Sequence, residues 1–107
     1  ATGTQIGDLA EIRAIKRIFG ESPKFPVSST KALTGHGLSY AGILELALCI
    51  RALSESFTPG TANLLEPDPQ SQGLHLPKDN LEGGARRFLS NSSGFGGANV
   101  SLAIQLP

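Results

Sequence analysis

Residues 39–54 read SYAGILELALCIRALS, and this stretch decides the fold. Its apolar residues occur on nearly every side of a helical wheel, and only Glu45 and Arg51 interrupt them. A helix that is apolar almost all round has to be buried on all sides. Because a chain of 107 residues is short for covering such a helix, the stretch predicts a core helix of a larger protein.

The composition supports the same interpretation. The chain has no methionine and begins at Ala1, so we expect a fragment of a longer parent.

The charge and the cysteine count exclude several classes of partner and site. Nine basic residues balance nine acidic ones, and this balance points to neither a nucleic acid nor a membrane surface as partner. One cysteine cannot form an internal disulfide, which favours a reducing, cytoplasmic compartment. We expect no metal site, because no spacing of Cys, His, Asp or Glu resembles a zinc or EF-hand site, and no cofactor, because the sequence has no Walker loop or dinucleotide fingerprint. We expect no membrane span, since apolar runs stay well below roughly 20 residues.

On the N-terminal side of this stretch, the spacing predicts an amphipathic helix that begins near Asp8 and ends at Gly20. Asp8 is a good N-cap residue, and Glu11 three residues later resembles a capping box. Residues 25–29 are predicted to form a short buried strand, and residues 30–37 a loop that leads into the core helix.

On the C-terminal side, residues 57–84 are rich in turns and are expected to wrap the surface in short extended pieces. Residues 86–90 read as a strand. Apolar residues then alternate with polar or small ones from Val100 to Leu106, which is the period of a strand. The glycine-rich turn at residues 94–97 predicts that these two strands pair antiparallel.

Three polar segments could carry chemistry. The loop with Lys31 and His36 leads toward a helix N-terminus, which suits the stabilisation of an oxyanion; alternatively, His36 only satisfies a backbone carbonyl. The hydroxyls of Thr2 and Thr4 could hold a ligand arm, or form a simple polar turn. Backbone N–H groups of residues 91–99 could build half an oxyanion hole, or belong to a tight hairpin.

The two remaining candidate side chains carry weaker signals. Cys49 falls in the middle of the apolar helix and is expected to be inert packing rather than a nucleophile. His75 lies in the turn-rich region, where we expect a surface position.

The order and spacing of four segments resemble the C-terminal part of the β-ketoacyl-acyl carrier protein synthases, which are condensing enzymes of the thiolase-like fold. These segments are TGTQIGD at residues 2–8, STKALTGH at 29–36, Asn63 followed by Asp68-Pro69, and NSSGFGGAN at 91–99. The resemblance implies an α/β fold, namely the C-terminal half of a thiolase-like fold, with a mixed β-sheet packed on helices. It implies that residues 1–107 form one subdomain and that the N-terminal half is absent.

The family catalyses a decarboxylative Claisen condensation in fatty acid or polyketide biosynthesis. The resemblance implies that His36 is the second of two histidines that stabilise the enolate oxygen. It implies that Lys31 and Glu11 support the site through a hydrogen-bond network. Thr2 and Thr4 match the hydroxyls that hold the pantetheine arm, and Phe95 matches the residue whose backbone N–H helps form the oxyanion hole.

The family's first histidine is expected immediately before Ala1, and its nucleophilic cysteine far upstream, so this fragment alone is expected to be inactive. Two departures from the family pattern are Tyr40, bulky where small residues are usual, and Ser93, which replaces an aromatic residue. The implied partner is an acyl carrier protein that bears phosphopantetheine-linked acyl and malonyl groups, and the implied parent is a cytoplasmic homodimer or a ketosynthase heterodimer. Two alternatives are a non-catalytic partner subunit of the chain-length-factor type and a free-standing binding module.

Overall fold

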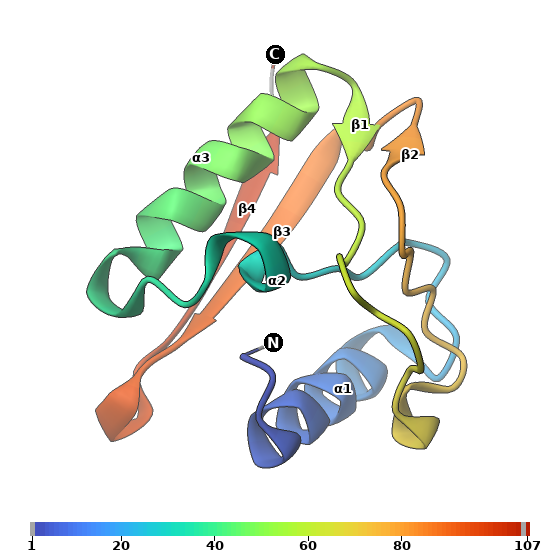
Figure 1. Cartoon of the computed structure of the whole chain (residues 1–107), viewed down its shortest axis with the longest axis vertical. Coiled ribbons are helices and arrows are strands. Elements are labelled where there is room, and N and C mark those ends of the chain that lie inside the picture. The colour runs from blue at the N-terminus through green and yellow to red at the C-terminus, as the bar shows by residue number, and fades with distance from the viewer. Residues whose placement is uncertain (1, 106) are drawn as a thin grey trace. The chain divides into compact units, whose positions relative to one another are not determined.

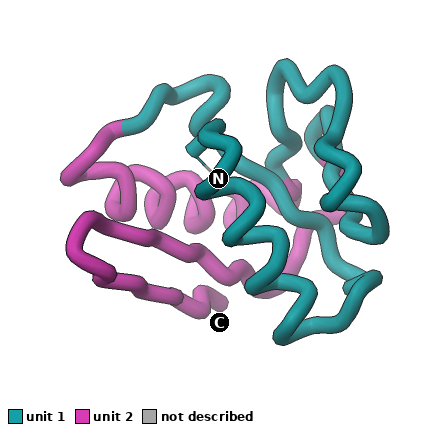
Figure 2. Tube along the Cα trace, turned by 90° about the horizontal axis from the view of Figure 1, so that it is seen from below, with its two compact units in different colours: residues 1–36, 59–80 teal, residues 37–58, 81–107 magenta. Residues whose placement is uncertain are grey.

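The computed structural model describes residues 2–105 and 107, so Leu106, assigned to the terminal strand above, lies outside the described residues. The chain folds into helices and short antiparallel strand pairs, which makes it an α/β protein (Figure 1). It divides into two compact units (Figure 2, teal and magenta). Unit 1 comprises Ala1–His36 and Pro59–Asn80, and unit 2 comprises Gly37–Thr58 and Leu81–Pro107.

The main helix of unit 1 is α1, Gln5–Phe19. It ends at Gly20 as predicted, but it begins earlier than predicted, because Thr4 and not Asp8 is the N-cap. The Thr4 hydroxyl accepts a hydrogen bond from the Gly7 N–H at 3.2 Å, so the first turn closes before Asp8 is reached. Ile15 is the buried residue of α1, and the helix packs against the short 3-10 helix η2, Pro69–Ser71.

The predicted strand at residues 25–29 is absent from the described part of unit 1. Pro26 forms only an isolated parallel bridge with His75, and the Val27 N–H donates to the His75 carbonyl at 2.9 Å. Since Pro26 has no N–H to give to a strand ladder, the pairing stops there. The predicted loop at residues 30–37 also differs, because it contains a short helix, α2, Lys31–Thr34.

Unit 2 is built on α3, Ala41–Ser54, which follows a 3-10 turn, η1, at Leu38–Tyr40. The predicted terminal hairpin is confirmed: β3, Arg87–Ser93, pairs antiparallel with β4, Asn99–Gln105, with Ser90 opposite Leu102. The short strands β1, Phe57–Thr58, and β2, Leu81–Glu82, form a second antiparallel pair. The helix α3 contacts β1, β3 and β4 (Figure 1).

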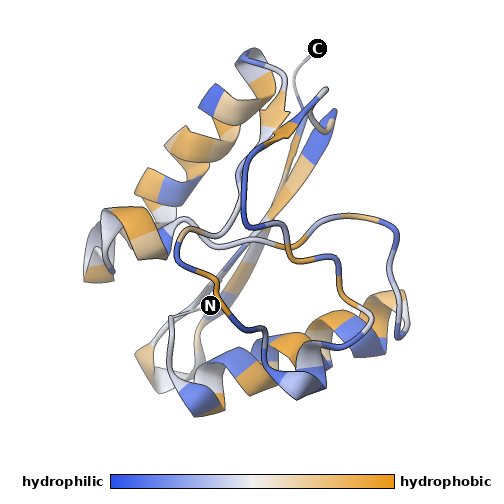
Figure 3. Ribbon diagram, turned by 45° about the vertical axis from the view of Figure 1, so that its right-hand side comes forward, coloured by the Kyte–Doolittle hydropathy of each residue, from blue (hydrophilic) through white to orange (hydrophobic). Residues whose placement is uncertain are grey.

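Two expectations about this packing are not met within the chain. The described strands pair only in antiparallel ladders, so the predicted mixed sheet is absent from residues 2–105. The helix α3 is also not buried on all sides: Ala52 and Leu53 are buried, whereas Ile43 is 66% exposed and Ile50 43% exposed. Hydrophobic colour covers much of the side of α3 that Figure 3 shows, yet the packing within the chain leaves part of this helix exposed.

The helices of the described residues are all too short or too polar to cross a membrane.

Candidate active site

The segment that precedes α1 forms a closed polar turn. The backbone N–H groups of Thr2 and Gly3 each donate to Oδ1 of Asp8 at 3.1 Å. The hydroxyl oxygens of Thr2 and Thr4 lie 3.1 Å apart, within hydrogen-bond distance. Both threonines are exposed and Asp8 is half-buried. The structure therefore brings the two predicted hydroxyls together on the surface of unit 1.

Gly7 lies directly beneath this hydroxyl pair. A Cβ atom at that position would lie 2.6 Å from the Thr4 hydroxyl oxygen and 3.2 Å from that of Thr2. The absence of a side chain at Gly7 thus leaves the space that the two hydroxyls occupy. The sequence assigned Asp8 to the N-cap and did not identify its contact with residues 2 and 3, because both Thr4 and Asp8 are favoured N-cap residues.

The other predicted residues of unit 1 lie on different elements. Glu11, on α1, is half-buried and lines a pocket of about 170 Å³. Lys31 is the first residue of α2 and is also half-buried, and its backbone N–H lies 3.4 Å from the Ser29 hydroxyl oxygen. The Ser29 N–H in turn donates to the Thr61 hydroxyl at 3.0 Å, which ties the segment before α2 to the turn-rich region.

His36 is exposed, and it lies in the segment that the sequence predicts to lead toward the N-terminus of the core helix. The helix α3 begins only at Ala41, and the turn η1 lies between it and His36 along the chain. Gly37, the next residue, is buried.

Phe95 belongs to unit 2, where it begins the short turn η3, Phe95–Gly97, between β3 and β4. Its side chain is fully exposed. The turn is closed by the Gly94 N–H, which donates to the Ala98 carbonyl at 2.7 Å, and by the Asn99 amide, which donates to the Gly97 carbonyl at 3.2 Å. Gly96 and Gly97 have φ values of 83° and 84°, which favour glycine, and the predicted glycine turn connects β3 to β4.

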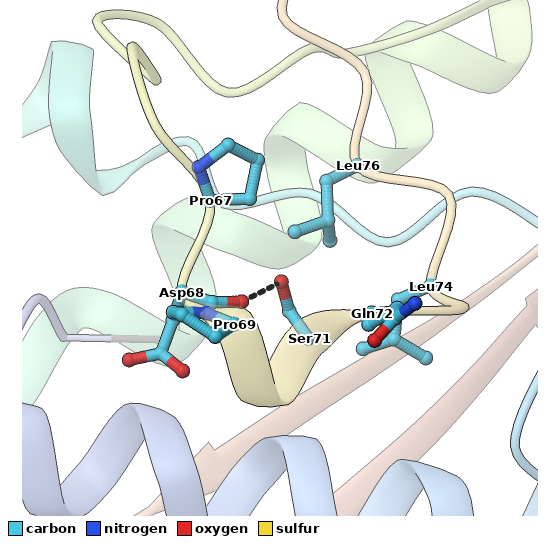
Figure 4. Close-up of a pocket in the computed structure, with 7 residues that line it drawn as sticks. All are labelled: Pro67, Asp68, Pro69, Ser71, Gln72, Leu74 and Leu76. Atoms are coloured by element: carbon cyan, nitrogen blue, oxygen red, sulfur yellow. Dashed lines mark hydrogen bonds between the residues drawn. The ribbon is translucent and has the colours of Figure 1, made fainter.

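A second pocket of unit 1 adjoins the pocket of Glu11, with which it shares several lining residues. It has a volume of about 390 Å³ and is lined by prolines, leucines and polar residues of the turn-rich region, namely Pro67, Asp68, Pro69, Ser71, Gln72, Leu74 and Leu76 (Figure 4). The buried Ser71 hydroxyl donates to the Asp68 backbone carbonyl at 2.6 Å, and this bond joins two of the residues that line the pocket. None of the six predicted site residues lines it.

Cys49 on α3 is expected to react slowly, in agreement with a packing role. Burial, and then the Glu45 carboxylate, raise the pKa of the Cys49 thiol above its ordinary value. Because the thiolate is the reactive form, a raised pKa leaves less of it at neutral pH.

We expect iodoacetamide to alkylate Cys49 in the folded chain more slowly than in the chain unfolded by urea, with a rate that keeps rising above pH 9. Glu45→Gln should lower the pKa and speed the reaction; equal rates in folded and unfolded chain would contradict this prediction.

Comparison with known proteins finds one family and many relatives. Residues 1–65 match the family described as the C-terminal domain of β-ketoacyl synthases. The chain is 40% identical over 106 residues to 3-oxoacyl-[acyl-carrier-protein] synthase 1 of Buchnera aphidicola subspecies Acyrthosiphon pisum, which covers 97% of this chain and 26% of that protein. It is 37% identical over 105 residues to the protein of the same name from Escherichia coli K12, covering 97% of this chain and 25% of that protein.

A relative with a polyketide name matches equally well. The chain is 38% identical over 105 residues to the actinorhodin polyketide putative beta-ketoacyl synthase 1 of Streptomyces coelicolor, covering 97% of this chain and 22% of that protein. The chain thus spans about a quarter of the length of the curated relatives that it matches.

Proposed function

Because this chain belongs to the β-ketoacyl synthase family, through that family's C-terminal domain, we propose that it is the C-terminal part of a 3-oxoacyl-[acyl carrier protein] synthase of fatty acid or polyketide biosynthesis. The observation that carries the proposal is the family match over residues 1–65. That match contains five of the six predicted site residues, and the identity to the relatives extends to residue 91 and beyond.

The proposed reaction makes one carbon–carbon bond. An acyl group is first held as a thioester on a cysteine outside these 107 residues. Malonyl thioester then loses carbon dioxide, and the electron pair of the broken bond forms an enolate. The enolate carbon attacks the acyl carbonyl, and the enzyme thiolate leaves as the 3-oxoacyl product forms on the acyl carrier protein. Negative charge develops on a carbonyl oxygen in both carbon steps, so hydrogen-bond donors aimed at that oxygen stabilise the transition states.

Each predicted residue takes one role in this reaction. His36 donates a hydrogen bond to the enolate oxygen of the malonyl unit, and Lys31 and Glu11 support it through a hydrogen-bond network. The Phe95 N–H donates to the oxygen of the acyl thioester. The role of Phe95 is supported by its turn, which two hydrogen bonds close, so that the backbone that carries the N–H is held in place.

Thr2 and Thr4 hold the pantetheine arm of the acyl carrier protein. Pantetheine carries amide groups that both donate and accept hydrogen bonds, and a hydroxyl does the same. The 3.1 Å distance between the oxygens of these two exposed threonines supports this role, since both hydroxyls can face one extended arm.

The dimeric state of the parent protein and its cytoplasmic location stay predictions.

One observation favours the second candidate, a non-catalytic partner subunit. The ring of Tyr40 packs so closely on Gly37 that a Cβ atom there would lie 2.6 Å from a ring carbon. A bulky ring next to the histidine segment could narrow the site. The retention of both Lys31 and His36 argues against this alternative, because a non-catalytic subunit has no chemical need for them.

The test is an assay of a full-length synthase that carries these 107 residues. We expect it to release carbon dioxide from malonyl-acyl carrier protein and to form a 3-oxoacyl product when acyl-acyl carrier protein is added. The 107-residue chain alone is the matched control and should do neither. A folded full-length protein without decarboxylation or condensation would refute the proposal, and condensation that appears only with a second synthase subunit would favour the alternative.

A further inference from the structure

We propose that Asp8 is a positioning residue that sets the geometry of the hydroxyl pair of Thr2 and Thr4. The inference rests on the proposed function, because it gives that pair the task of holding the pantetheine arm. It assigns to Asp8 a role other than the N-cap that its sequence position suggests.

The hydrogen bonds of the turn support this role directly. Oδ1 of Asp8 accepts from the N–H groups of both Thr2 and Gly3, each at 3.1 Å. One carboxylate oxygen therefore fixes two consecutive peptide units, and the Thr2 side chain extends from one of them. Hydrogen bonds to an ionised acceptor are about twice as strong as neutral ones. Asp8 itself is half-buried, whereas both of these hydrogen bonds are exposed to solvent.

The second hydroxyl is fixed from the helix side. The Thr4 oxygen accepts from the Gly7 N–H at 3.2 Å, and the Asp8 N–H donates to the Thr4 carbonyl at 2.9 Å. Asp8 thus holds Thr4 through its own backbone and Thr2 through its side chain. With Thr2 held by the Asp8 side chain and the Thr4 hydroxyl held by the Gly7 N–H, the two hydroxyl oxygens lie 3.1 Å apart.

The Asp8 carboxylate can act in two ways: its charge stabilises the N-terminus of α1, and its oxygen accepts hydrogen bonds. Asp8 is the fourth residue of α1, where negative charge is favourable near the helix N-terminus. That effect depends on charge and not on the direction of one oxygen. A positioning role depends on an acceptor atom at Oδ1, and the two explanations therefore predict different behaviour for asparagine, which keeps the acceptor and loses the charge.

The experiment compares Asp8→Ala with Asp8→Asn in a full-length synthase that carries this chain. Asp8→Ala should raise the KM for malonyl-acyl carrier protein about ten-fold, equivalent to about 1.4 kcal/mol, and leave kcat within about two-fold. Asp8→Asn should restore KM to within about three-fold of the parent. Glu66→Ala, which removes an exposed carboxylate elsewhere in unit 1, is the matched control and should leave both constants unchanged.

A second measurement keeps the proposal testable if Asp8→Ala folds poorly. Hydrogen exchange of the peptide that contains Thr2 and Gly3 should be faster in Asp8→Ala than in Asp8→Asn or the parent. Gly7→Ala reaches the same hydroxyls from below: its methyl group displaces the Thr4 oxygen, while the gain in helix propensity offsets the lost cap. It should raise KM with little change in the melting temperature.

The outcomes separate this inference from the proposed function. Thr2→Val tests the hydroxyl itself, and a KM unchanged by Thr2→Val would overturn the pantetheine role and this inference with it. A KM raised by Thr2→Val but unchanged by Asp8→Ala would overturn the positioning role alone. Asp8→Asn as impaired as Asp8→Ala would also overturn it, because charge and not the acceptor atom would then matter.

Discussion

His36→Ala in a full-length synthase that carries this chain is expected to lower malonyl decarboxylation by about 10²–10³-fold, the usual loss when one preorganised oxyanion donor is removed. Acyl transfer from acyl carrier protein to the nucleophilic cysteine should stay largely intact, because that step does not form the enolate. Release of labelled carbon dioxide measures the first half-reaction, and labelling of the enzyme by acyl-acyl carrier protein measures the second.

His75→Ala is the matched control for this variant. His75 is an exposed histidine of the same unit, and its carbonyl, not its ring, accepts the hydrogen bond from Val27. Its replacement should leave both half-reactions unchanged. Equal loss of decarboxylation and acyl transfer in His36→Ala would contradict the role assigned to His36, since a general disturbance of the site would then explain the result.

Gly73→Ala is expected to destabilise the chain by about 2–5 kcal/mol. Gly73 has a φ of 92°, where an L side chain costs about 1–2 kcal/mol. A Cβ atom there would also collide with the backbone carbonyl oxygen of Glu21, and overpacking of this kind costs about 1–3 kcal/mol. Chemical denaturation followed by circular dichroism measures the change, and for a small domain this is a large part of the total stability.

Two other glycines separate the two causes. Gly83 has a φ of 78° with no atom within 4 Å of the added Cβ, so Gly83→Ala should cost only about 1–2 kcal/mol, from the backbone conformation. At Gly60 the Cβ would lie 2.5 Å from the Asp79 carbonyl oxygen, and Gly60→Ala should cost about 1–3 kcal/mol from crowding. We expect the order Gly83, Gly60, Gly73 in increasing loss. A Gly73 variant no less stable than the Gly83 variant would show that the contact with Glu21 relaxes without cost.

Local signals of the sequence predicted several elements well. Gly20 ends α1, and the alternation after Val100 predicted β4 and its pairing with β3 across the glycine turn. These features depend on residues close together in the chain. The start of α1 was wrong because Thr4 and Asp8 have the same capping preference, and only the contacts of residues 2 and 3 with Asp8 distinguish them.

Signals that depend on distant partners failed. Residues 25–29 have the composition of a strand, yet their partner around His75 offers a single bridge. The apolar residues of α3 predicted burial on every side, but burial needs other elements, and the strands of unit 2 leave Ile43 and Ile50 exposed. The predicted site divides in the same way: the hydroxyls of Thr2 and Thr4 meet within one turn, while Phe95 belongs to a different unit from His36.

The sequence by itself determined the family of this protein, the end of its first helix and its terminal hairpin. The reason is that motifs, helix-terminating residues and strand alternation depend on residues that are close together in the sequence. Only the tertiary structure decided that Asp8 ties down the turn before α1, that His36 is exposed and that Gly73 lies against the carbonyl of Glu21. Each of these depends on where a side chain or peptide unit meets a partner after folding, and residue type alone does not fix that position.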